Sequence, residues 1–170
     1  MMWIARCLIA AGLLLPAGCS QEDQAALPQP LEPDATAIAY FCHMSLPEHE
    51  GPKGQAFMRG HDKPFWFASV SEAFVFLETE LSQPKDLRIL YVNDMSKGSW
   101  ERPAPGAWID IHKAIFVVDS SRTASMGGKE AVPFATRDTA EAFVKQYGGT
   151  LADFDAAAKA LAVDKNTGAG

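Results

Sequence analysis

The sequence has few cysteines and no long apolar segment after its first residues. Cysteine occurs at positions 7, 19 and 42 only. Beyond the amino-terminal stretch no run approaches the about 20 apolar residues that a membrane-spanning helix needs. Basic residues are also scarce, with 15 Lys and Arg against 21 Asp and Glu and a formal net charge of −6 at pH 7. An acidic chain without a basic run argues against nucleic acid and against electrostatic docking on anionic lipid.

Residues 1–18 have the pattern of a bacterial export signal. An apolar run at 7–15 follows a single positive charge and is too short to span a bilayer. The run leads into LPAGC, which ends at Cys19 and resembles a lipobox, where the peptide is cut before a cysteine that then carries lipid. Pro16 stands where an aliphatic residue is usual, so an ordinary signal peptide cut near the same place is the alternative. Ser20 resembles the residue found in lipoproteins that are passed on to the outer membrane.

Processing at Cys19 leaves Cys42 as the only thiol of the chain. Cys7 would leave with the signal and Cys19 would become a thioether, so no intramolecular disulfide can form. A lone thiol in an oxidising compartment is prone to oxidation unless it is buried or bound. Cys42 is therefore the first candidate for chemistry.

Composition divides the remaining chain into a tether, a folded body and a tail. Residues 20–36 hold three prolines and four acids with little large apolar content. This composition predicts that 19–37 form a lipidated amino terminus and a disordered tether. The folded body is expected over 38–163, and 164–170 are expected to be a disordered tail.

A weak internal duplication predicts the fold. PFWFASVSEAFVFLE (64–78) and VPFATRDTAEAFVKQYGG (132–149) share an apolar strand end, a polar cap and a helix that carries Glu-Ala-Phe-Val. A strand candidate precedes each of these segments, QAFMR (55–59) and WIDIHKAIFVV (108–118). Each helix leads into a further strand, so the pattern strand–strand–helix–strand occurs twice. The prediction is an α+β protein of two similar ββαβ lobes, with units at about 55–92 and 108–154. An Ala-rich helix over 153–163 follows.

Polar residues at the helix starts and glycines at one helix end support this division. Ser69 or Ser71 is expected to cap the first helix, and Thr136 or Asp138 the second. Gly148, followed by another glycine, is a good stop for the second helix.

Cys42 and Met44 form a candidate pair of sulfur ligands. On an extended segment their side chains project from the same face, while His43 between them points away. Thiolate and thioether are soft donors that suit Cu(I), whereas zinc sites rarely use thioether. The alternative is an incidental pattern in which Met44 fills space in the core.

Other soft or nitrogen donors are few. Met126 stands in TASMGGKEAVPF (123–134), a glycine-containing loop before the second unit's helix. A methionine before two glycines suggests a role for its sulfur, although it could also cap an edge of the core. The remaining donors are His49, His61, His112, Met58 and Met95. We interpret His61 and Met95 as turn residues, His112 as a solvated strand residue and Met58 as a core residue.

At this point the residues resemble a known family. FCHMSLPEHEGPKGQAF (41–57) and SMGGKEAVPFATRDTAEAFVKQYGG (125–149) are similar to NosL, the copper-binding lipoprotein accessory to nitrous oxide reductase. The resemblance covers essentially the folded body and the lipoprotein leader. It implies a tandem ββαβ architecture, in agreement with the duplication.

The resemblance also implies a site and a role. Cys42 and Met44 match the family's copper motif, and Met126 matches its loop methionine. The residue between Cys and Met is commonly glycine in the family, so His43 is an additional candidate ligand here, as is His49. The implied role is a metallochaperone, not an enzyme, which carries Cu(I) toward nitrous oxide reductase.

The implied partners are the nitrous oxide reductase apo-protein and the Nos ABC-type assembly complex. The implied location is periplasm-facing, at the outer membrane through lipid on Cys19.

Two other classes of function remain open from the sequence. One is a structural or partner-binding lipoprotein without metal, in which the sulfur residues belong to the core. The other is a thiol enzyme with Cys42 as nucleophile and His43 or His49 as base. The enzyme is the weaker of the two, because no acid that would orient the base is evident.

Overall fold

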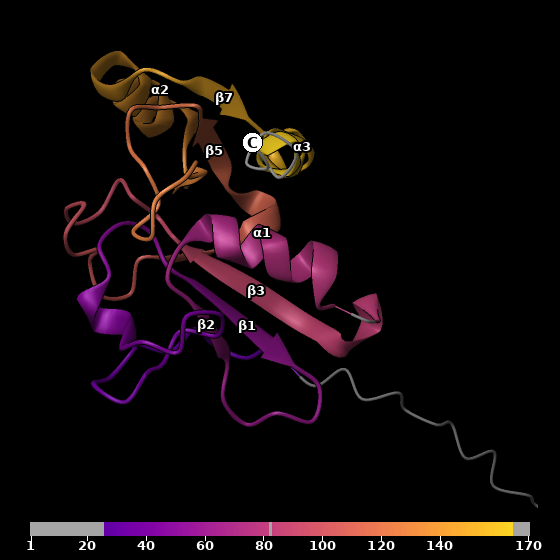
Figure 1. Ribbon diagram of the computed structural model, residues 1–170. Helices are drawn as coiled ribbons and strands as arrows, with labels where there is room; N and C mark the ends of the chain where they lie inside the picture. Colours follow the sequence, from indigo (N-terminus) through magenta and orange to yellow (C-terminus); the bar gives the residue numbers. More distant parts are fainter. Residues whose placement is uncertain (1–25, 82, 165–170) are drawn as a thin grey trace, which may run out of the picture.

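The computed structural model describes residues 26–81 and 83–164, which form two antiparallel sheets and three helices (Figure 1). The strands are β1 (Gly54–Met58), β2 (Phe65–Phe67), β3 (Leu87–Asn93), β4 (Trp108–Asp110), β5 (Ile115–Val118), β6 (Val132–Phe134) and β7 (Thr150–Ala152). The helices are α1 (Val70–Thr79), α2 (Arg137–Tyr147) and α3 (Phe154–Asp164), with 3-10 turns η1 (Leu46–Glu48), η2 (Pro84–Asp86) and η3 (Ile111–Lys113).

The prediction of a tandem ββαβ fold is confirmed. The first sheet has the order β2-β1-β3-β4 and the second β6-β5-β7, so the three strands of each unit are arranged alike. The expected strand region 108–118 is divided, however. β4 pairs with β3 of the first unit, η3 follows it, and β5 opens the second unit at Ile115. Alternating residues show a strand but do not show which sheet it joins.

Local capping fixes where the long helices begin and end. The Ser69 side chain accepts a hydrogen bond from the amide of Glu72, and the Thr136 side chain accepts one from the amide of Thr139. These two residues are therefore the caps among the predicted pairs. Gly148 ends α2 with a φ of 69°, a left-handed value that glycine adopts at little cost.

Successive residues of β1 face opposite sides of the first sheet, and both sides are covered. A side chain on Gly54 would lie 3.2 Å from Ala73 Cβ of α1, so this face of the strand packs closely against the helix. Gln55 faces the other way, where its side chain accepts from the amide of Leu31 at 2.9 Å and donates to the Leu31 carbonyl at 3.0 Å. Because Gln55 is fully buried, both of its hydrogen-bonding groups need such a partner.

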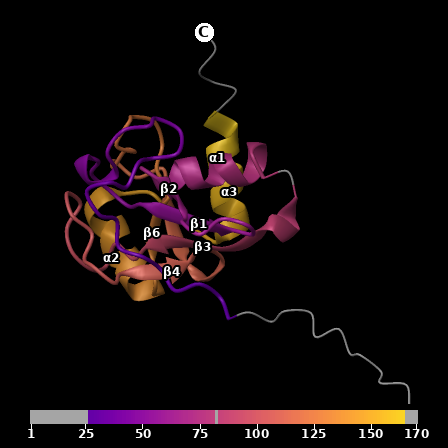
Figure 2. The same cartoon turned by 90° about the horizontal axis from the view of Figure 1, so that it is seen from below.

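Residues 26–33 form a strap across the outer face of the first sheet (indigo in Figure 2). Besides the Leu31 pairing, Tyr91 donates to the Pro28 carbonyl at 2.8 Å, and Arg88 donates to the Ala26 carbonyl at 3.0 Å. The expectation of disorder over 19–37 is therefore wrong for residues 26–37. Of the expected tail 164–170, Asp164 is the last residue of α3. Residues 19–25 and 165–170 lie outside the described residues.

One core joins the two lobes. On β5, Phe116 and Val118 belong to the same apolar cluster as α1, whereas Val117 belongs to the cluster under α2. Phe74 of α1 contacts Phe116 at 5.5 Å between ring centroids and Phe154 of α3 at 5.2 Å. Figures 1 and 2 show α3 beside α1, with α2 on the other side of the second sheet. Within the described ranges, no helix is long and apolar enough to cross a membrane.

Candidate metal centre

Cys42 lies in a tight chain reversal. The amide of Ala39 donates to the Met44 carbonyl at 2.9 Å, and the amide of His43 donates back to the Ala39 carbonyl at 3.0 Å. Ile38 and Ser45 pair antiparallel on either side of the turn. The prediction that residues 42–44 are extended is therefore wrong, and the i, i+2 argument for a two-sulfur clamp does not apply.

His43 supplies the left-handed residue that this turn needs. Its φ is 55°, a region that glycine enters freely and that costs other L-residues about 1–2 kcal/mol. A glycine at this position would adopt the same conformation at little cost. The His43 side chain is exposed.

The turn brings the Cys42 sulfur to a histidine from the next element. His49 directly follows η1, and its amide donates to the Leu46 carbonyl at 3.2 Å. The Cys42 Sγ and His49 Nε2 atoms are 3.7 Å apart. Cys42 is half-buried and packs beside Leu46 and Ala68. The thiol is thus packed against apolar side chains on one side and faces an imidazole on the other.

A serine from the second unit orients this imidazole. His49 Nδ1 lies 3.1 Å from Ser125 Oγ, and the Ser125 hydroxyl donates to the Ala68 carbonyl at 3.4 Å. In the tautomer with the proton on Nδ1, the serine oxygen accepts from Nδ1–H while its own proton is directed to that carbonyl. In this tautomer the Nε2 lone pair faces the Cys42 sulfur. This is how a second hydrogen bond sets the tautomer of a metal-ligating histidine.

Ser125 precedes Met126 in the chain, so its contact with His49 brings the Met126 loop to the imidazole. The loop closes through the Gly127 amide, which donates to the Ala124 carbonyl at 2.8 Å. Met126 is 57% exposed and Met44 on the turn is 41% exposed, unusual values for methionines. Both methionines are exposed to solvent, and in the chain Met44 lies two residues after Cys42 while Met126 follows Ser125, which contacts His49.

A buried carboxylate ties the end of this loop to α1. Glu130 accepts from the Ser71 amide at 3.0 Å and from the Ala131 amide at 2.9 Å. Burial raises the pKa of Glu130 to about 7, against the opposing effect of these hydrogen bonds. The bond to the first turn of α1 holds the loop of the second unit against the first unit.

A buried lysine, Lys53, stabilises the segment that follows His49. Lys53 Nζ donates to the Glu50 carbonyl at 3.0 Å and to the Gly51 carbonyl at 2.7 Å. Burial lowers the pKa of Lys53 to about 8. Sequence reasoning did not single out Lys53, Ser125 or Glu130. The signal available in the sequence was the presence of Lys53 and Glu130 within the quoted motifs GPKG and MGGKE.

The other candidate donors lie elsewhere. Met58 packs at the edge of the main core and Met95 in the second core, so neither joins the centre. His61 contacts Phe65, and His112 lies in η3 rather than on a strand. Among residues 26–81 and 83–164, no three His, Cys, Asp or Glu side chains form a group that could hold a metal. A metal at Cys42 and His49 would therefore draw on methionine sulfur for further ligands.

These features define an α+β protein with a surface centre of soft donors. Residues 30–162 match the family described as NosL. Two relatives named copper-binding lipoprotein NosL support the match. The one from Achromobacter cycloclastes is 39% identical over 147 residues, 85% of this chain and 75% of its own. The one from Stutzerimonas stutzeri is 34% identical over 158 residues, 91% of this chain and 78% of its own.

A solved structure agrees. The crystal structure of the copper chaperone NosL from Shewanella denitrificans matches with a TM-score of 0.68 at 35% identity, covering 75% of this chain and 93% of that chain. This chain belongs to the NosL family. Its relatives are named as a binding protein and a chaperone rather than as enzymes.

Proposed function

We propose that this protein is a periplasmic Cu(I) carrier that delivers copper for the maturation of nitrous oxide reductase. The observation that supports it most directly is the approach of Cys42 Sγ and His49 Nε2 to 3.7 Å, with Nδ1 of the same imidazole 3.1 Å from Ser125 Oγ. Thiolate and neutral imidazole are both copper ligands. Met44 and Met126 are the proposed thioether ligands, whose softness favours Cu(I).

His43 is not in the proposed set. Its left-handed backbone serves the turn, and the ligand position opposite Cys42 is taken by His49. Of the two histidines that the motif offers, His49 is the one whose ring is oriented by a further hydrogen bond, as metal-ligating histidines usually are.

The exposure of the thioethers supports transfer rather than storage. A donor from a partner can reach the ion while Cys42 and His49 still hold it, because the two methionine side chains are open to solvent. Ligands are then exchanged one at a time, and copper is not released free. The proposed partners are the nitrous oxide reductase apo-protein and the Nos ABC-type assembly complex.

Lipid on Cys19 would anchor the carrier facing the periplasm, and we assign it to the outer membrane. The strap shortens the free tether that the sequence suggested. From Cys19 to Ala26, the first residue hydrogen-bonded to the sheet, the chain can span at most roughly 25 Å. The carrier would therefore stay close to the membrane surface.

The test of binding is an anaerobic Cu(I) titration against a chromophoric chelator. One tight equivalent is expected for the wild type. Cys42→Ser is expected to abolish tight binding, because a serine oxygen is a poor substitute for thiolate. His49→Ala is expected to weaken binding by about 10–100-fold, the loss typical of altered metal-site support. His61→Gln, an exposed histidine that contacts Phe65, is the matched control.

Wild-type affinity in Cys42→Ser would overturn the site, and equal losses in His49→Ala and His61→Gln would remove His49 from it. Delivery is tested separately by mixing the copper-loaded chain with copper-free nitrous oxide reductase and following the reductase's absorption. Transfer should continue when a chelator traps free Cu(I). If the chelator stops it, the ion travels free and the chain is not a carrier.

A further inference from the structure

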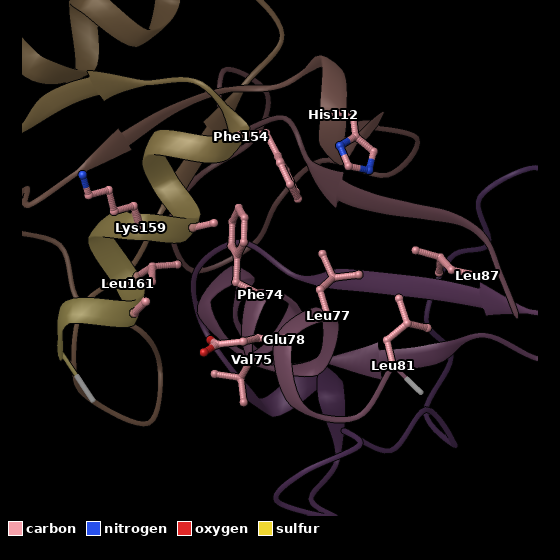
Figure 3. Close-up of a pocket in the computed structure, with 12 residues that line it drawn as sticks. Phe74, Val75, Leu77, Glu78, Leu81, Leu87, His112, Phe154, Lys159 and Leu161 are labelled. Atoms are coloured by element: carbon pink, nitrogen blue, oxygen red, sulfur yellow. The ribbon is translucent and has the colours of Figure 1, made fainter. Parts of the chain in front are cut away.

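An apolar groove lies apart from the candidate metal centre, none of whose residues lines it. It lies between α1 and α3, with the start of β3 at one end, and has a volume of about 600 Å³. Figure 3 shows Phe74 and Leu77 of α1 and Phe154 of α3 pointing into the gap between the two helices. Leu81, Leu87, Leu161 and the small Ala158 also line it, so the groove has the chemistry of a hydrocarbon site.

The groove contains no sulfur donor, and polar side chains stand only among its rim residues. Glu78, His112 and Lys159 are the charged or titratable residues that line it. An apolar cavity with few polar groups selects shape and hydrophobicity rather than a charged ligand. The groove therefore has no part in holding copper.

The described chain begins close to this groove. Arg88 donates to the Ala26 carbonyl, and its neighbour Leu87 lines the groove. Leu87 lines the groove, whereas Arg88, the bulged residue next to it, reaches the strap, so the strap end and the groove both lie beside the start of β3. Only the residues between Cys19 and Ala26 separate the attachment point of a lipid from this place. Their reach of roughly 25 Å is enough to pass around the sheet edge, given a spacing of about 10 Å between packed layers.

We propose that the groove receives one acyl chain of the lipid that the protein carries on Cys19. The proposal rests on the lipidation proposed above, and it is independent of copper binding. A saturated chain of about sixteen carbons fills roughly 500 Å³ if each methylene takes about the room of a liquid water, so one chain fits and three do not. The remaining acyl chains stay in the bilayer.

The expected consequence is a fixed orientation. An acyl chain seated between α1 and α3 would hold the strap end of the first sheet toward the membrane. The ion site would then keep a constant position relative to the bilayer, instead of rotating about a free tether. Methylene transfer into a protein groove and into a bilayer are both driven by removal from water, so the chain can move between the two.

The test uses the full lipidated protein in nanodiscs of deuterated lipid. Mass spectrometry first establishes that Cys19 is acylated, which separates failure of lipidation from failure of this proposal. Nuclear Overhauser effects are then recorded between the protonated acyl chains and the leucine methyls of the protein. Contacts to Leu77, Leu81 and Leu161 are expected. An acylated protein without these contacts overturns the proposal.

A blocking variant supplies the control. Ala158→Trp fills the groove and should abolish the acyl contacts, whereas Ala142→Trp on the exposed surface of α2 should retain them. Unchanged far-ultraviolet circular dichroism shows that both variants are folded. A second sample tests whether the bilayer is the source of the acyl chain in the groove. It contains a protein without acyl chains (Cys19→Ala behind an ordinary signal peptide) in nanodiscs of protonated lipid. Contacts in that sample, with none in the deuterated discs, would assign the groove to membrane lipid and refute the anchor.

Discussion

Replacing the buried carboxyl of Glu130 with an amide should change how stability depends on pH. Glu130 is buried at the junction of the two units, and its pKa is raised to about 7 from an ordinary value of 4.5. Between these two values the unfolded chain has lost the proton and the native chain keeps it. The native state thus binds more protons, so the free energy of unfolding falls as pH rises through this window.

The magnitude follows from the two pKa values. Each unit of pKa difference corresponds to about 1.4 kcal/mol, so the full window is worth about 3 kcal/mol. In Glu130→Gln the amide oxygen can still accept from the Ser71 and Ala131 amides, but no charge appears in the interior. The variant should therefore gain stability over the wild type as pH rises from 4.5 to 7, by up to about 3 kcal/mol.

Urea denaturation across this pH range measures the effect. Glu141→Gln is the matched control, because Glu141 forms only an exposed i,i+4 pair with Arg137, a type worth about 0.3–0.5 kcal/mol. Its curve should run parallel to that of the wild type. If Glu130→Gln also runs parallel, Glu130 is ionised throughout in the native state, and the argument from burial fails.

Three further outcomes follow from the geometry. Met126→Ala should speed the loss of Cu(I) to a chelator in stopped-flow mixing, with little change in melting temperature because the side chain is 57% exposed; an unchanged release rate would exclude the thioether. His43→Gly should leave Cu(I) affinity unchanged and stability equal or higher by up to about 1 kcal/mol, since the φ is 55°; weaker binding would make His43 a ligand. Gly149→Ala should lose more stability in urea than Gly148→Ala, because its new methyl would lie 2.6 Å from the Val118 carbonyl oxygen while that of Gly148 meets nothing within 4 Å. Equal losses would contradict this packing.

Local signals in the sequence were sufficient for much of the fold. Ser69, Thr136 and Gly148 mark helix ends through bonds that reach only a few residues, and the Glu-Ala-Phe-Val repeat marks both helices. Pairing of strands could not be obtained in the same way. The alternation over 108–118 was interpreted as one strand region, whereas the register of β4 against Tyr91 assigns its first residues to the other sheet.

The strap (residues 26–33) shows why the prediction of disorder from composition was wrong. Prolines and acids over 20–36 predict disorder because they bury little apolar area. What orders Leu31 is the buried Gln55, whose amide must be satisfied and finds its partner 24 residues away. A sequence shows that a glutamine is present, but its burial and its partner are tertiary facts.

The same division holds at the metal centre. The sequence by itself determined the candidate donors: Cys42, Met44 and Met126 by their softness and motif, with His49 as a further candidate. Their geometry was decided by the tertiary structure. The extended clamp is wrong because hydrogen bonds between Ala39 and Met44 reverse the chain. The proposal of His49 depends on Ser125, 76 residues further along, which contacts the imidazole beside the thiol. Donor chemistry belongs to single residues, whereas the direction of a lone pair depends on contacts between segments that only folding brings together.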